Sequence, residues 1–273
     1  MKATFFPIAS TLLALAATSF GQTESPVQSA ARPYNLDIVD TVQLAGSDEA
    51  SADFQTNVLP GMLEIINSNL SEATSVQNVA AISVDPTNLT LTSDATVRVY
   101  FLGEGAGYHN TLGYSTTNGS AITSDAALIF PDASSSQGLY GSGSDIRSSS
   151  EPLAPGDFVD LGTLTAGTSL DFFLIADGAN GGQNYYSTQD SLNADGIVHA
   201  VSLAADGSAY LIIGFEDLWG GGDRDYNDLV FAVYIGQSNV ANLAALGAPE
   251  PTLAAGALLS CCGLAFNRRR KRA

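Results

Sequence analysis

The loop formed by residues 216–228 lies between two apolar stretches and holds most of the side chains that could do chemistry. They are Glu216, Asp217, Asp223, Asp225, Asn227 and Asp228. Two carboxylates about 4 Å apart repel one another by about 4 kcal/mol at an effective dielectric constant near 20. A hard cation turns that repulsion into binding, since Ca²⁺ takes about six to eight oxygen ligands. The loop therefore predicts a calcium site formed by these residues.

The spacing within the loop supports a turn that presents several oxygens inward. Every second residue from Asp223 to Asn227 offers an oxygen, and the glycines at 220–222 let the backbone fold tightly beside them. The pattern is not an EF-hand, because Asp228 replaces the required glycine and Tyr234 stands where the bidentate glutamate belongs. A metal-free interpretation stays open, in which Asx turns and an ion pair with Arg224 organise the loop.

A second oxygen-rich stretch, residues 177–195, precedes this loop. Its candidate ligands are Asp177, Asn180, Asn184, Asp190, Asn193 and Asp195. Asp and Asn side chains also organise turns by bonding to nearby backbone groups. Turn formation is the favoured interpretation of this stretch, with a second cation as the alternative.

The residues that usually perform catalysis are sparse. The histidines, His109 and His199, lie outside metal-ligand spacings such as HExxH. Ser142 lies in a Ser/Gly-rich stretch that predicts a surface loop rather than a strand-to-helix elbow. We therefore predict that the protein is not an enzyme. A secreted glycan hydrolase remains an alternative, because that chemistry needs only two suitably spaced carboxylates.

Aromatic residues near the acids suggest a further alternative, a carbohydrate-binding module for exopolysaccharide. The rings in or near loops are Tyr108, Tyr114, Tyr185, Tyr186, Trp219 and Tyr226. Exposed rings can stack on sugars, but rings at such positions also pack over the rim of a core. Rim packing is the favoured interpretation for most of them.

The segment from Gly214 to Phe231, GFEDLWGGGDRDYNDLVF, resembles the signature of an extracellular bacterial domain of unknown function. Residues 104–114 and 192–199 resemble segments found upstream in such proteins, so the likeness spans roughly residues 95–236. The resemblance implies a β-rich module of surface, adhesin-like or matrix proteins, often beside sorting tails. It implies no reaction and no ligand.

Residues 1–21 have the order of a secretory signal peptide. Lys2 precedes an uncharged apolar run from Phe5 to Ala17, and small residues follow up to Gly21. A buried N-terminal helix is the weaker alternative. We expect this segment to direct export and to be cleaved after Gly21 or Ala17.

The C-terminal residues 249–273 combine a Pro-Glu-Pro triplet, an uncharged apolar stretch and a basic cluster. The motif residues are Pro249, Glu250, Pro251, Arg268, Arg269 and Arg270. The arrangement resembles the bacterial PEP-CTERM sorting signal. The resemblance implies an exosortase-type membrane protease as partner, transient inner-membrane insertion, and release to the cell surface or extracellular matrix.

The length and charge of this tail fit that interpretation. Its apolar part has about 15 residues, below the roughly 20 that span a bilayer upright. Basic residues favour the cytoplasmic side of a membrane, so the rest of the chain would lie outside. A permanent tail anchor is the alternative.

The composition of the intervening chain narrows the function. Residues 22–248 hold 27 acidic residues, four arginines and no lysine, a net charge of −23. Nucleic acid is excluded as a partner, because a phosphate backbone requires a basic surface. Divalent cations fit this charge, as does simple solubility. Both cysteines, Cys261 and Cys262, lie in the tail, so the body needs a core of its own rather than disulfides.

Short apolar runs separated by turn residues predict a mostly β fold, an antiparallel, jelly-roll-like β-sandwich. Apolar residues at helical spacing predict one short N-terminal helix within residues 48–70, with Pro60 in its first turn. Signal and sorting helices are expected at the two ends. The expected strands are 79–84, 89–92, 96–102, 126–130, 158–161, 170–175, 197–203, 210–215 and 229–235. The last has two apolar faces and should be central.

We divide the chain accordingly into five parts. They are a signal peptide (1–21), a lead-in with the helix and first strands (22–94), the β-sandwich domain of unknown function (95–236), a linker (237–248) and the sorting tail (249–273).

Overall fold

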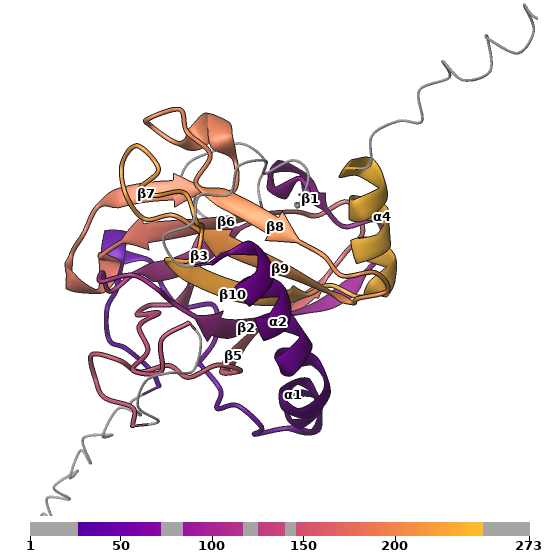
Figure 1. Ribbon diagram of the computed structural model, residues 1–273, viewed down its shortest axis with the longest axis horizontal. Coiled ribbons are helices and arrows are strands. Elements are labelled where there is room, and N and C mark those ends of the chain that lie inside the picture. Colours follow the sequence, from indigo (N-terminus) through magenta and orange to yellow (C-terminus); the bar gives the residue numbers. More distant parts are fainter. Residues whose placement is uncertain (1–26, 72–83, 117–124, 140–145, 248–273) are drawn as a thin grey trace, which may run out of the picture.

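The computed structural model describes residues 27–71, 84–116, 125–139 and 146–247. Within these ranges two five-stranded antiparallel sheets pack face to face (Figure 1). The predicted β-sandwich is therefore confirmed. The expected signal peptide and sorting tail lie outside the described residues, as does nearly all of the expected strand at 79–84. Among the described helices, none is long and apolar enough to cross a membrane.

The first sheet has the order β1-β6-β3-β4, with β7 also paired to β6. Its strands are β1 (Leu89–Thr90), β3 (Thr111–Ser115), β4 (Ala127–Phe130), β6 (Ser169–Ala176) and β7 (Asn184–Ser187). The sequence did not predict β3 or β7. Gly113 interrupts the apolar pattern of β3, and the ring of Phe173 fills the space that a Cβ at Gly113 would need.

The second sheet has the order β5-β2-β10-β9-β8. Its strands are β2 (Ala95–Gly103), β5 (Phe158–Leu164), β8 (Ala200–Leu203), β9 (Tyr210–Phe215) and β10 (Leu229–Tyr234). β10 pairs with β9 from Leu229 opposite Phe215 to Tyr234 opposite Tyr210, and with β2 on its other side. The central position predicted for this strand is confirmed.

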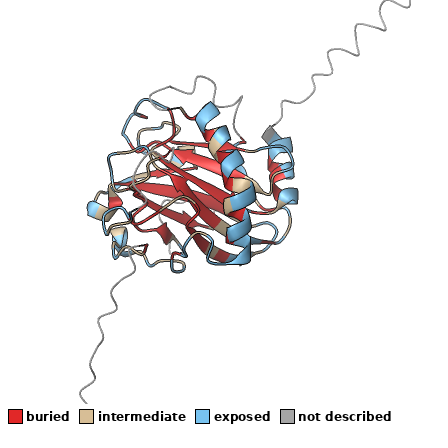
Figure 2. Cartoon of the chain, turned by 60° about the horizontal axis from the view of Figure 1, so that its bottom comes forward, coloured by how far each residue is buried: buried red, intermediate tan, exposed pale blue. Residues whose placement is uncertain are grey.

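Two cores meet at β10. Phe231 and Val233 point between the sheets, whereas Val230 and Ala232 belong to a second core on the outer face of the second sheet. A helical segment covers that outer face, and Figure 2 shows its exposed side turned to solvent above buried strands. Both faces of β10 are therefore buried, which explains why apolar and polar residues do not alternate along it.

The covering segment consists of α1 (Glu49–Asp53), a π-helical turn (Phe54–Val58) and α2 (Leu59–Asn69). The Asp48 side chain caps it by accepting a hydrogen bond from Ser51 N, at 2.7 Å. Pro60 lies in the first turn of α2, as expected. Proline has no N–H and crowds the preceding turn, and the wider π-turn just before Pro60 fits that constraint. The helical segment is longer than the short helix that we expected.

Residues 237–248 were expected to be a linker, but Gln237–Gly247 form helix α4. Val240 and Leu243 are buried in the core between the sheets. The side chain of Asn239 is buried as well and accepts hydrogen bonds from Thr92 N and Ser93 N, at 2.8 and 3.0 Å. α4 is thus part of the folded body.

Asn239 gives a test of that packing. Asn239→Ala leaves the N–H groups of Thr92 and Ser93 without their acceptor, so we expect the free energy of unfolding to fall by about 2 kcal/mol. Gln237→Ala, an exposed position on the same helix, should change it by less than about 0.5 kcal/mol. Urea denaturation measures both. Equal effects of the two substitutions would contradict a structural role for α4.

Candidate metal centre

The acidic loop joins β9 to β10 and folds back over the strand that enters it. A Cβ on Gly214 would collide with the carbonyl oxygen of Tyr226, so only glycine permits this approach. Arg224 and Tyr226 adopt left-handed backbone conformations, with φ of 63° and 55°. The loop is therefore compact, and its two ends are fixed by the pairing of central strands.

Three of the six candidate ligands come together in this loop. Glu216, Asp223 and Asp225 each place one carboxylate oxygen within 4.8 Å of the others. Glu216 and Asp225 are buried and Asp223 is exposed, so the cluster has one side open to solvent. Gly222, with φ of 45°, leaves room for the Glu216 carboxylate, because a Cβ there would collide with Oε2.

The electrostatics of Glu216 show the cost of this arrangement. Burial raises the pKa of Glu216 to about 7, and the charges of Asp225 and Asp223 add to the effect. The backbone N–H of Tyr226 donates to Oε1 at 3.1 Å and offsets part of the shift. Near neutral pH this carboxyl group therefore holds a proton for part of the time, which a bound cation would displace.

Asp217 and Asp228 form a separate pair. Asp217 N donates to Asp228 Oδ2 at 2.8 Å, and Asn110 Nδ2 donates to Asp217 Oδ2 at 2.8 Å. Burial raises the pKa of both, and the charge of Asp217 raises that of Asp228 further. Such a pair keeps one proton rather than ionising twice. It ties the two ends of the loop together rather than joining the three-carboxylate cluster.

Asn227 positions Asp225. Its backbone N–H donates to Asp225 Oδ1 at 3.2 Å and its side-chain amide donates to Oδ2 at 2.8 Å. The carbonyl of Asn227 accepts a hydrogen bond from Gly105 N at 3.0 Å. A Cβ on Gly105 would lie 2.5 Å from Asn227 Oδ1, so that oxygen faces Gly105. The structure thus gives Asn227 a supporting position beside the cluster.

The metal-free alternative required Arg224 to pair with the acids. Arg224 is exposed and takes part in none of the ion pairs between described residues. The Asx turn of that alternative is present, in the bond from Asn227 N to Asp225. Turn chemistry therefore shapes the loop, but this arginine does not fill it.

His199, which the sequence predicted only as part of a strand, is buried and contacts the backbone of Glu216. His199 Nδ1 lies 3.1 Å from the Glu216 carbonyl oxygen, and Nε2 lies 2.9 Å from Asp195 Oδ2. Both ring nitrogens therefore lie within hydrogen-bond distance of an oxygen. Asp195 Oδ2 also accepts a hydrogen bond from Gly220 N at 2.9 Å. Asp195 and His199 thus link the two oxygen-rich loops.

The pKa of Asp195 reflects these contacts. Burial acts to raise it, but hydrogen bonds from Gly220 N, His199 and Ile197 N more than compensate and hold it below its usual value. The spacing of Asp195 and His199, four residues apart in an Asp/Asn-rich segment, was the one signal in the sequence for this contact.

The other oxygen-rich residues of 177–195 mainly serve turns. Asp177 Oδ1 accepts hydrogen bonds from His109 N and Asn180 Nδ2, at 3.2 and 2.9 Å. Asn193 Oδ1 accepts one from Ser187 N at 2.7 Å. These contacts match the favoured interpretation of this segment.

His109 does not form a nucleophile relay. Its Nδ1 faces both Ser134 Oγ, at 3.1 Å, and Asp132 Oδ2, at 3.5 Å. A Ser-His-Asp relay places the serine and the carboxylate on opposite ring nitrogens. The cluster therefore cannot pass a proton from the serine through the ring to the carboxylate.

The six loop aromatics differ in burial, and Tyr185 is half-buried. Tyr114, Tyr186 and Tyr226 are buried, which agrees with packing against the core. Tyr108 and Trp219 are 43% and 63% exposed. Only these last two present large ring surfaces to solvent.

Residues 164–235 match a family model described as a domain of unknown function (DUF4114). The resemblance to a domain of unknown function is confirmed for this part, which runs through β10 and contains the acidic loop. The description assigns no enzymatic activity and no ligand. No curated protein and no solved structure matches the chain.

The raised pKa of Glu216 predicts that the free energy of unfolding depends on pH when a chelator keeps metal ions away from the protein. Glu216 titrates near 4.5 in the unfolded chain and near 7 in the folded protein. Between these values the folded state keeps a proton that the unfolded state has lost. The free energy of unfolding should therefore fall as the pH rises through this window.

The matched variant is Glu216→Gln, which should weaken this pH dependence without removing it. Glu104 contributes in the same window, because burial also raises its pKa to about 7. Urea denaturation at several pH values measures the slope. An unchanged slope in Glu216→Gln would contradict the account of Glu216.

Proposed function

We propose that the protein is a non-enzymatic, calcium-stabilised protein of the cell surface or extracellular matrix. The observation that carries the proposal is the cluster of Glu216, Asp223 and Asp225, whose oxygens lie within 4.8 Å of one another. Acids are common on surfaces without an ion. Here, however, two of the three are buried, and burial together with the charges of Asp225 and Asp223 raises the pKa of Glu216 to about 7.

The chemistry of the ligands favours calcium over other cations. The three side chains offer hard oxygen ligands, whereas Zn²⁺ sites usually include nitrogen or sulfur. Ca²⁺ accepts irregular geometry and completes its shell with backbone carbonyls and water. Mg²⁺ requires near-ideal octahedral geometry and gives up water reluctantly. A loop with one exposed ligand, Asp223, and a solvent side suits the less demanding ion.

A bound ion would act on the fold rather than on a substrate. Glu216 directly follows β9, and Asp225 lies a few residues before β10. Because β10 contributes to both cores, a cation between these carboxylates would hold the connection between two central strands. This is why we assign the centre a structural role.

The terminal segments supply the proposed location. Residues 1–21 would direct export, and residues 249–273 would insert transiently in the inner membrane and be recognised by an exosortase-type protease. The body released to the outside would be strongly acidic and free of lysine. Matrix proteins or exopolysaccharide would then be its neighbours.

Two other functions remain open. A carbohydrate-binding module is favoured by exposed Tyr108 and Trp219, and a glycan array tests it directly. A secreted glycan hydrolase rests on the abundance of acids alone, which any strongly acidic protein shares.

The proposed centre is tested by calorimetric titration of calcium into protein from which a chelator has removed metal ions. We expect saturable binding and a rise in melting temperature, since a ligand at about 100 times its Kd adds about 2.7 kcal/mol to the free energy of unfolding. Asp223→Asn and Asp225→Asn should each weaken binding at least about tenfold, because each removes a charged ligand. Magnesium should bind more weakly.

The matched control for these variants is Asp206→Asn, an exposed aspartate in the turn between β8 and β9. It should bind calcium like the wild type. Equal losses in all three variants would show a general charge effect, and no binding by the wild type would exclude the ion.

Fractionation of cells that make the full chain tests the sorting proposal. The full chain should pass through a membrane-associated form, because its apolar tail inserts transiently. A variant ending at residue 248 should be exported without that form. A full chain that stays in the cytoplasm would contradict export by residues 1–21.

A further inference from the structure

A polar cavity lies on the outer face of the second sheet, beside α1 and apart from the metal centre. Its volume is about 350 Å³, in the range of small-molecule sites. Tyrosines from three neighbouring strands and charged residues around them form its walls. They are Tyr100 of β2, Tyr210 of β9, Tyr234 of β10, Asp53, Arg98 and Asp160.

The rings are held in place by one another. Phe54 stacks on Tyr100 with ring centroids 3.8 Å apart. The Tyr100 and Tyr210 centroids are 6.1 Å apart, and Tyr234 meets Tyr210 edge-on at 5.1 Å. Tyr234 is 37% exposed and completes the wall at the solvent side. Tyr100 is buried beneath this wall, so a ligand would meet the accessible parts of Tyr210 and Tyr234, whose fixed positions lower the entropy cost of binding.

The charge of the cavity is negative. Arg98 is bound to Asp160, with Nε to Oδ1 at 2.6 Å and Nη2 to Oδ2 at 2.9 Å, and to Asp48 at 2.9 Å. Of the two carboxylates that bind Arg98 only Asp160 lines the cavity, and Asp53 on α1 adds a second, so two carboxylates and one cation line it. The guanidinium group also lies over the ring of Phe158, 4.0 Å from its centroid. Because its guanidinium group is paired with two carboxylates, Arg98 is not available to bind an anion.

We infer that this cavity binds a small organic cation, an alkylated ammonium group that lies against the tyrosine rings near Asp53 and Asp160. A cation gains from the ring faces, which carry negative electrostatic potential, and from the net carboxylate charge. A neutral sugar would gain stacking alone, and an anion would be repelled. The arrangement is separate from the calcium proposal and does not depend on it.

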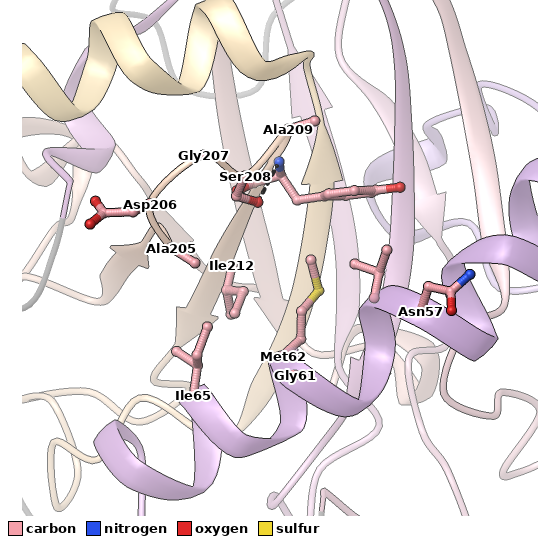
Figure 3. A pocket seen from close by; sticks show the side chains of 12 residues that line it. Asn57, Gly61, Met62, Ile65, Ala205, Asp206, Gly207, Ser208, Ala209 and Ile212 are labelled. Atoms are coloured by element: carbon pink, nitrogen blue, oxygen red, sulfur yellow. Dashed lines mark hydrogen bonds between the residues drawn. The ribbon is translucent and has the colours of Figure 1, made fainter.

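The neighbouring cavity shows a contrasting chemistry. Tyr210 also lines this second space, of about 390 Å³, between α2 and the turn from β8 to β9. Met62 and Ile65 of the helix face Ile212 across it (Figure 3). Its walls are mainly apolar and include one acidic residue, Asp206, against the two acidic residues of the first cavity, so it suits a cation less well. The cation is therefore assigned to the first cavity.

The test compares choline with its neutral isostere 3,3-dimethylbutan-1-ol, and both with glucose. Binding to the full chain is followed by NMR line broadening and calorimetry with calcium present throughout. We expect saturable choline binding that weakens as salt increases. Tyr234→Leu and Asp53→Asn should each weaken it about five- to tenfold, as expected for loss of a ring face or a nearby charge.

Two control variants keep the result specific. Tyr108→Leu removes an exposed tyrosine outside this cavity, and Ile65→Ala alters the neighbouring apolar cavity. Both should bind choline like the wild type, and melting temperatures confirm that every variant is folded. Equal binding of choline and its neutral isostere, or binding of glucose alone, would overturn the inference.

Discussion

The loop that connects the central strands β9 and β10 crowds carboxylates together, and the rest of the structure depends on this constraint. β9 and β10 pair in continuous register, and both faces of β10 are buried. The connection between them brings Glu216, Asp223 and Asp225 together, with one oxygen of each within 4.8 Å of the others. Glu216 and Asp225 are therefore buried close together despite their mutual repulsion, and the raised pKa of Glu216 is the consequence.

Many neighbouring features serve to position these acids. Gly214 and Gly222 leave space for the returning loop and for the Glu216 carboxylate. Asn227 holds both oxygens of Asp225, and the ring of His199 bonds the carbonyl of Glu216. These contacts orient the carboxylates. A hard cation would complete the arrangement, which is why we interpret the centre as structural rather than catalytic.

The sequence predicted the parts that follow from local pattern. Unbroken apolar character on both faces of residues 229–235 identified β10 as central, and the clustering of acids identified the loop. It could not predict which acids converge, because the separation of Asp217 and Asp228 from Glu216 depends on the fold of the whole loop. β3 was missed because Gly113 breaks its pattern for a packing reason, the ring of Phe173. α4 was missed because its apolar residues are few, although Val240 and Leu243 are buried.

The central claim is that a cation takes the place of a proton on Glu216. Calorimetric calcium titrations in buffers of different ionisation enthalpy count the protons released on binding. The account predicts release near pH 6.5 that declines above pH 8, since the pKa of Glu216 is about 7. Glu216→Gln should lose most of that release. Calcium binding without proton release in the wild type, or the same release in Glu216→Gln, would contradict the account.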